Sequence, residues 1–288
     1  MARPIFFPDA PGQKDNSRIV ILPVPFDRTS TWGKGSDNGP NAILAASEHL
    51  EGLEIETRTQ PYTLGIYTDE PVLANTVEQM VRQVDNRVGY WLDHGRFVVI
   101  LGGEHSVNIG SIQAHAARTP DLTILQLDAH ADLRDRYKGS QYNHACVMAR
   151  ARDICQIAQV GIRSMDLQEY IENGSPRILF ADQIQSTADW MDLVIGWLGP
   201  KVYITIDLDV FDCSIMPSTG TPEPGGLDWW QVTGLLREVC RQRLVVGLDV
   251  VELCPIPGLR GPDMLAARLI YKLLAYRFLP ELPVHISL

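Results

Sequence analysis

Short runs of apolar and β-branched residues recur along the chain and are bounded by turn residues. Runs of this length, flanked by Gly, Pro, Asn or Asp, are typical of strands buried in a sheet. Seven strands are predicted from this pattern, over residues 18–22, 96–101, 122–127, 157–161, 177–180, 201–206 and 244–248.

Helical patterns lie between several of these strands. One has apolar residues at spacings of three and four from Val77 to Leu92 and ends at Gly95, in the position of a C-terminal cap. Further helices are predicted over residues 40–50, 107–118, 228–241 and 263–278. Strands that alternate with helices indicate a parallel sheet with helical crossovers.

The Gly/Pro-rich stretch 216–226 interrupts this pattern, but a strand of the same character follows it. We interpret the stretch as a loop beside the functional site rather than as a domain boundary. Residues 1–288 are therefore predicted to form one domain.

Composition narrows the class of protein. Of the 288 residues, 45% are hydrophobic and 21% are charged, and no apolar run approaches the roughly 20 residues that cross a bilayer. The five cysteines form no C-x-x-C pair, which suits the reducing cytoplasm, and residues 1–16 lack a signal-peptide core. The net charge of -10 argues against a nucleic-acid partner. We expect a cytoplasmic protein without nucleic-acid or membrane partners.

Acids and histidines gather where four predicted strands end. In an extended backbone alternate side chains share one face, so Asp128, His130 and Asp132 are expected to point at one centre. Ligands of open parallel sheets bind beyond the carboxyl ends of the strands. The four strand ends are therefore predicted to share one pocket: Gly102-Gly103-Glu104-His105, Asp128-Ala129-His130-Ala131-Asp132, Asp207-Leu208-Asp209, and Asp249 with Glu252.

Six of these side chains are candidate metal ligands: His105, Asp128, His130, Asp132, Asp207 and Asp209. Carboxylates and imidazoles without thiolates suit manganese, magnesium or zinc. Six ligands are too many for one tetrahedral ion, and four adjacent carboxylates repel one another, so two ions that share bridging carboxylates are expected. A lone His or Asp after a strand is more often a hydrogen-bonded residue or a helix cap, and Asp207 with Asp209 alone would also suit a phosphotransferase. Neither alternative explains the whole set.

Four segments together resemble the ureohydrolase family, which includes arginase and agmatinase: Gly102-Gly103-Glu104-His105-Ser106, Asp128 to Asp132, Asp207-Leu208-Asp209-Val210-Phe211-Asp212, and the loop Gly220 to Gly226. The resemblance runs from about Asp27 to the last predicted helix. It implies an arginase-like three-layer α/β/α domain with a mainly parallel eight-stranded sheet. It also implies cleavage of a guanidino group to urea and an amine.

Carried over to this chain, the resemblance implies two Mn²⁺ ions. His105 and Asp132 would bind one ion, His130 and Asp209 the other, and Asp128 and Asp207 would bridge them. Bound divalent ions lower the pKa of water towards roughly 7 and so supply a nucleophile.

The resemblance also implies three catalytic residues. Asp132 would orient the nucleophile, His144 would carry a proton to the departing amine, and Glu252 would pair with the guanidinium. Cys213 and Cys254 depart from the family pattern, which usually has proline and asparagine there, but neither is a ligand position. His49, His94, His115 and His285 are assigned no role.

The resemblance leaves the substrate open. The segment Leu133 to Tyr142 resembles the agmatinase branch, so agmatine, giving putrescine and urea, is the leading expectation and N1-aminopropylagmatine follows it. Guanidinobutyrate would need a cation for its carboxylate. Arg134, Arg136 and Lys138 are candidates for that cation, although a solvated loop face is the interpretation that we favour for all three.

Two further alternatives remain at this point. Arginase activity would need groups for the α-amino and α-carboxylate groups of arginine, and the Ser/Thr/Asn-rich segment that supplies them in arginases is absent. A ureohydrolase-like binding protein without activity is the alternative from a different class, but all six ligands, His144 and Glu252 are present. The family also implies a homotrimer or homohexamer that acts on a small cationic guanidino substrate.

Overall fold

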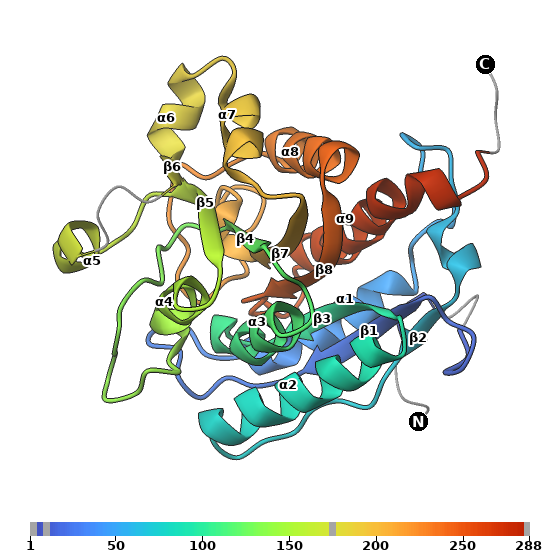
Figure 1. Ribbon diagram of the computed structural model, residues 1–288, viewed down its shortest axis with the longest axis horizontal. Coiled ribbons are helices and arrows are strands. Elements are labelled where there is room, and N and C mark those ends of the chain that lie inside the picture. The colour runs from blue at the N-terminus through green and yellow to red at the C-terminus, as the bar shows by residue number, and fades with distance from the viewer. Residues whose placement is uncertain (1–4, 8–11, 173–176, 285–288) are drawn as a thin grey trace.

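The computed structural model describes residues 5–7, 12–172 and 177–284. In this part of the chain eight strands form one sheet in the order β2-β1-β3-β8-β7-β4-β5-β6, and every adjacent pair is parallel (Figure 1). The strands are β1 Ile19–Val24, β2 Ile66–Thr68, β3 Phe97–Gly102, β4 Leu122–Leu127, β5 Gln156–Ile162, β6 Ile178–Phe180, β7 Lys201–Asp207 and β8 Leu244–Val251.

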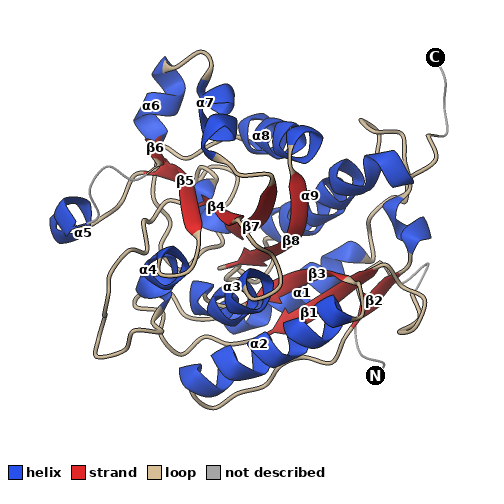
Figure 2. Ribbon diagram, in the orientation of Figure 1, coloured by secondary structure: helices blue, strands red, loops and turns tan. Residues whose placement is uncertain are grey.

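Helices cover both faces of the sheet (Figure 2). One face packs against α2 Val77–Asp93, α3 Asn108–Ala116 and α4 Val147–Arg152. The other packs against α1 Gly39–Ser47, α6 Ala181–Ser186, α7 Trp190–Trp197, α8 Trp229–Gln242 and α9 Gly261–Phe278. The short helix α5 Leu167–Glu172 lies at the edge of the molecule (Figure 1). The predicted three-layer α/β/α architecture is confirmed.

The alternation of side chains along each strand explains why both faces are apolar. In β1, Ile19 and Ile21 belong to the cluster beneath α1 and α9, whereas Val20 and Leu22 belong to the cluster beneath α2. A strand buried on both faces needs apolar residues at consecutive positions, which is the pattern seen in the sequence. Within the described part of the chain, every helix is too short or too polar to span a bilayer.

Local signals fix the ends of the longer helices. Thr76 caps α2, since its hydroxyl accepts the backbone N–H of Gln79, and Gly95 follows the helix with a φ of 69°. Asp228 and Gln231 form a reciprocal capping box at the start of α8. Proline stands in the first turn of both α1 and α9, where no N–H donor is needed.

All seven predicted strands are present, and β2 is an eighth that the pattern did not predict. The four strands whose ends carry acids and histidines, β3, β8, β7 and β4, are consecutive at the centre of the sheet. Because the strands are parallel, their carboxyl ends meet at one edge. One boundary differs from the prediction: β8 continues to Val251, so Asp249 lies inside the strand rather than beyond it.

Candidate metal centre and active site

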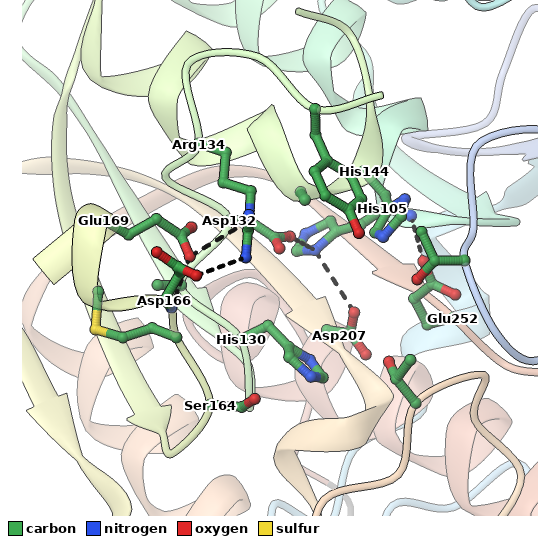
Figure 3. A pocket seen from close by; sticks show the side chains of 16 residues that line it. His105, His130, Asp132, Arg134, His144, Ser164, Asp166, Glu169, Asp207 and Glu252 are labelled. Carbon is green, nitrogen blue, oxygen red and sulfur yellow. Dashed lines mark hydrogen bonds and ion pairs between the residues drawn. The ribbon is translucent and has the colours of Figure 1, made fainter. Parts of the chain in front are cut away.

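The predicted metal ligands converge at the carboxyl edge of the sheet. His105 Nδ1 lies 3.0 Å from Asp132 Oδ2 and 3.5 Å from Asp207 Oδ2 (Figure 3). The same atom lies 3.1 Å from Asp128 Oδ2. His130 Nδ1 lies 2.9 Å from Asp209 Oδ2 and 3.8 Å from Asp128 Oδ1. Converging ligand atoms thus form two groups among the described residues, His105 with Asp128 and Asp132, and His130 with Asp128 and Asp209. Asp128 belongs to both.

Hydrogen bonds around His105 orient its ring so that the Nδ1 atom faces the carboxylates. The Thr205 hydroxyl donates to Asp249 at 2.7 Å, so it accepts from His105 Nε2 at 2.9 Å. A proton therefore resides on Nε2, which leaves Nδ1, the ring atom that faces the three carboxylates, as the atom that would bind a cation. This buried Nδ1 atom has no hydrogen-bond partner. Asp249 is fully buried and orients the His105 ring through the Thr205 hydroxyl.

The carboxylates of this cluster carry an electrostatic cost that cations would relieve. Burial, and after it the charges of Asp209 and Asp132, raises the pKa of Asp128 to about 7. Burial and the charges of Asp209 and Asp128 raise the pKa of Asp207 well above its ordinary value. Oxygen and imidazole ligands packed this closely fit divalent ions such as manganese, magnesium or zinc.

The backbone from Asp128 to Asp132 does not continue the strand β4, which corrects the geometric basis of the prediction. The strand β4 ends at Leu127, and the chain then bends so that His130 forms an isolated bridge with Ser164. Asp132 has a φ of 52° and its carbonyl accepts the N–H of Met148 at 2.9 Å. The three side chains therefore converge through a bend and a left-handed residue rather than through strand alternation.

Glu252 lies beside the cluster, as predicted, and also has a left-handed backbone, with a φ of 65°. Its Oε1 atom accepts the backbone N–H of His105 at 2.7 Å, and its own N–H donates to Gly103 at 2.8 Å. Only glycine fits at position 103, because a Cβ atom there would lie 2.0 Å from the carbonyl oxygen of Phe26. These contacts hold a carboxylate at the wall of the cavity.

His144, at the start of a 3₁₀ turn, also lines the cavity. Burial lowers its pKa below the ordinary value, against the opposing charges of Asp132 and Glu104. Its Nδ1 atom lies 3.2 Å from the hydroxyl of Thr29, a residue that the sequence pattern did not single out. Glu104, although it precedes His105, turns away from the ligands and binds the loop that carries Thr29.

The cavity has a volume of about 310 Å³ and extends from the ligand cluster to an acidic pair, Asp166 and Glu169. In Figure 3 this pair lies at the end opposite Glu252, with Arg134 between the pair and Asp132. Arg134 lies 3.6 Å from a carboxylate oxygen of each acid and 4.8 Å from the centre of the Tyr137 ring. The sequence pattern did not identify either acid.

The structure separates the three basic residues of the loop after the ligand cluster. Arg136 and Lys138 are exposed and do not line the cavity, so the predicted solvated face is confirmed for these two. The same prediction is wrong for Arg134, because ion pairs with Asp166 and Glu169 draw it into the cavity.

The Gly/Pro-rich stretch 216–226 is a loop and contributes Thr221 to the cavity wall. Asp212 anchors this loop by accepting the backbone N–H groups of Gly225 and Gly226 at 3.0 and 3.2 Å. Cys213 follows Asp212 and is partly buried, and the Cys254 thiol donates to the carbonyl of Lys34 at 3.0 Å. Of the histidines without an assigned role, His49 and His94 are exposed, His115 is buried in the core, and His285 lies outside the described residues.

Comparison with known proteins identifies the family. A sequence model of the arginase family matches residues 17–275. The chain belongs to the arginase family. This arginase-family protein is a ureohydrolase, a hydrolytic enzyme, as are the relatives that it resembles over most of its length.

Two curated relatives of this arginase-family chain are N(1)-aminopropylagmatine ureohydrolases. The one from Thermus thermophilus is 40% identical over 269 residues, which cover 90% of this chain and 92% of the relative. The one from Synechocystis sp. is 35% identical over 273 residues, which cover 91% of this chain and 89% of the relative. The solved structure of the agmatine ureohydrolase of Thermoplasma volcanium superposes with a TM-score of 0.87 at 30% identity and covers 99% of this chain and 98% of that one.

Proposed function

We propose that this arginase-family enzyme hydrolyses N1-aminopropylagmatine to urea and the corresponding polyamine. The observation that carries the proposal is the 40% identity, over nine-tenths of the chain, to a relative that bears this name. Agmatine, the leading expectation from the sequence pattern, becomes the second candidate. It is supported by the 30% identity to the agmatine ureohydrolase of Thermoplasma volcanium.

The charges along the cavity suit a long polycation. Glu252 at one end can pair with the planar guanidinium (Figure 3). At the other end Asp166 and Glu169 share a single cation, Arg134, so this end keeps a net negative charge that suits an ammonium group of the substrate. Among the described residues that line the cavity, Arg134 is the only lysine or arginine, and it is already paired with both acids. A carboxylate tail such as that of guanidinobutyrate would meet an acidic wall there.

We further propose that two Mn²⁺ ions occupy the ligand cluster. His105 and Asp132 would hold one ion, His130 and Asp209 the other, and Asp128 and Asp207 would bridge them. When bound, divalent ions supply Lewis-acid activation of water at neutral pH.

The chain's own side chains would do the rest of the chemistry. Asp132 orients the attacking water, Glu252 holds the guanidinium, and His144 gives a proton to the departing amine nitrogen as the bond to the guanidino carbon breaks. Each of these residues lines the cavity.

Urea release from a panel of substrates tests the proposal. The protein is stripped of metal, reloaded with Mn²⁺ and assayed with N1-aminopropylagmatine, agmatine, arginine and guanidinobutyrate. We expect the highest kcat/KM for N1-aminopropylagmatine, loss of activity on stripping, and two Mn²⁺ ions per chain by mass spectrometry. A preference for agmatine would establish the second candidate. Urea from none of the four would support a binding protein without activity. Light scattering of the same sample tests the homotrimer or homohexamer expected from the family.

A further inference from the structure

A buried carboxylate links the loop that carries Thr29 to the end of β3. Glu104 is fully buried. Its Oε2 atom accepts the backbone N–H groups of Thr29 at 2.5 Å and Ser30 at 2.8 Å. Its Oε1 atom accepts the hydroxyl groups of Thr29 and Ser106, both at 2.6 Å. Two backbone donors and two hydroxyls give this carboxylate a full set of partners.

The Thr29 hydroxyl has one proton and three polar neighbours. It donates to Glu104 at 2.6 Å and accepts the backbone N–H of His144 at 3.0 Å. Its third neighbour is His144 Nδ1, at 3.2 Å. Since the hydroxyl proton is used on Glu104, the oxygen can only accept from this ring nitrogen. The Nδ1 atom must then carry a proton.

We propose that Thr29 is a positioning residue that, with Glu104 behind it, holds His144 as the Nδ1–H tautomer and so leaves Nε2 as the atom that exchanges protons with the cavity. This inference rests on the proposed function for its catalytic meaning. During the reaction Nε2 first takes the proton that the attacking water loses as its oxygen bonds to the guanidino carbon. Nε2 then gives this proton to the departing amine nitrogen as the bond between that nitrogen and the guanidino carbon breaks. The Nδ1 proton stays on the ring throughout, and the ring ends neutral, as it began.

Nuclear magnetic resonance of the imidazole nitrogens reads the tautomer directly. The full-length protein is labelled with ¹⁵N-histidine and loaded with Mg²⁺, because paramagnetic Mn²⁺ would broaden the signals. We expect the neutral His144 ring to carry its proton on Nδ1. A proton on Nε2 would show that Thr29 donates to the ring and would overturn the proposal. This readout does not depend on which guanidino compound is the substrate.

Three variants separate positioning from simple support of the loop. Thr29→Val keeps the shape and removes the hydroxyl, and Thr29→Ser keeps the hydroxyl. Ser106→Ala removes a different donor from the same Glu104 carboxylate without touching His144. The loop retains two other anchors in all three variants, since Ser30 N–H still donates to Glu104 and Gly35 N–H donates to Asp27 at 2.7 Å.

We expect Thr29→Val to lower kcat by roughly 10- to 100-fold, a part of what a general acid contributes, with little change in KM. It should also mix the two His144 tautomers. Thr29→Ser should restore both kcat and the Nδ1–H signal, and Ser106→Ala should keep that signal. A Thr29→Val enzyme with normal kcat and an unchanged tautomer would refute the inference while leaving the proposed function intact. Absence of urea from every substrate, with the tautomer as expected, would refute only the function.

Discussion

The stability of this protein should fall in acid because of one buried histidine that is not a candidate metal ligand. His115 in α3 is 1% exposed, its ring lies 4.7 Å from that of Tyr203, and its Nδ1 atom bonds the carbonyl of Ser111 at 2.8 Å. Burial is the largest cause that lowers the pKa of His115, from 6.5 to about 4.

The sign and the magnitude of the effect follow from proton linkage. Above pH 6.5 His115 is neutral in both states and its full contribution to stability is present. As the pH falls from 6.5 towards 4, the unfolded chain binds a proton that the folded protein excludes, so the free energy of unfolding decreases. The difference of about 2.5 pKa units, at about 1.4 kcal/mol per unit, amounts to a loss of about 3 kcal/mol by pH 4.

Denaturant unfolding, followed by circular dichroism at pH 7 and pH 4, measures this loss. The variant His115→Asn keeps a donor for the Ser111 carbonyl but does not titrate in this range. We expect the wild-type protein to lose about 3 kcal/mol more than the variant over the interval. The exposed His49, changed to Gln, serves as the matched control and should behave as wild type. Equal losses in wild type and His115→Asn would mean that His115 titrates normally in the folded state, which refutes the reasoning.

Three further predictions test the cavity, the core and the metal centre. Asp166→Asn should raise KM for N1-aminopropylagmatine by about 2- to 5-fold, the value of a half-exposed ion pair, with kcat unchanged in urea-release assays. The control Glu172→Gln, at the end of the helix α5 that begins just after Asp166, should change neither KM nor kcat. Lys272→Met should lower the free energy of unfolding by about 3–5 kcal/mol, because the buried Glu54, 2.7 Å from the Lys272 ammonium, loses its cation. The double variant that also carries Glu54→Gln should recover part of this loss. Removal of metal should lower the melting temperature measured by calorimetry, because a metal ion present at 100 times its Kd stabilises the folded protein by about 2.7 kcal/mol per site. An unchanged melting temperature would contradict the proposed metal centre.

The fold was largely predictable because each main strand is buried on both faces. The run that forms β3 contains only apolar residues and a glycine, and the run that forms β4 is interrupted only by Thr123 and Gln126. Such runs are visible without knowledge of the neighbouring strands. The strand β2 has three residues and pairs only with β1 at the edge of the sheet, so its sequence carries too little periodicity. The six-residue helices α5 and α6 are too short for a helical period to be distinguished from a loop.

The candidate ligands were predictable for a related reason, since they follow strands that the apolar pattern already located. The supporting residues were not. Thr29 reaches His144 across 115 positions of sequence, and Glu104 reaches Thr29 across 75, so no local spacing connects them. Arg134 resembles its exposed neighbour Arg136 in sequence, and only the folded position of Asp166 and Glu169 distinguishes the two.

The left-handed backbones of Asp132 and Glu252 have a consequence for attempts to make this enzyme more robust. Left-handed backbone favours glycine, and a residue with a Cβ atom is strained there, Glu more than Asp. A library selected only for thermal tolerance would therefore be drawn towards glycine at these two positions, and each such change would delete a carboxylate from the cavity. Selection for folding and selection for turnover should oppose each other most strongly at residues 132 and 252.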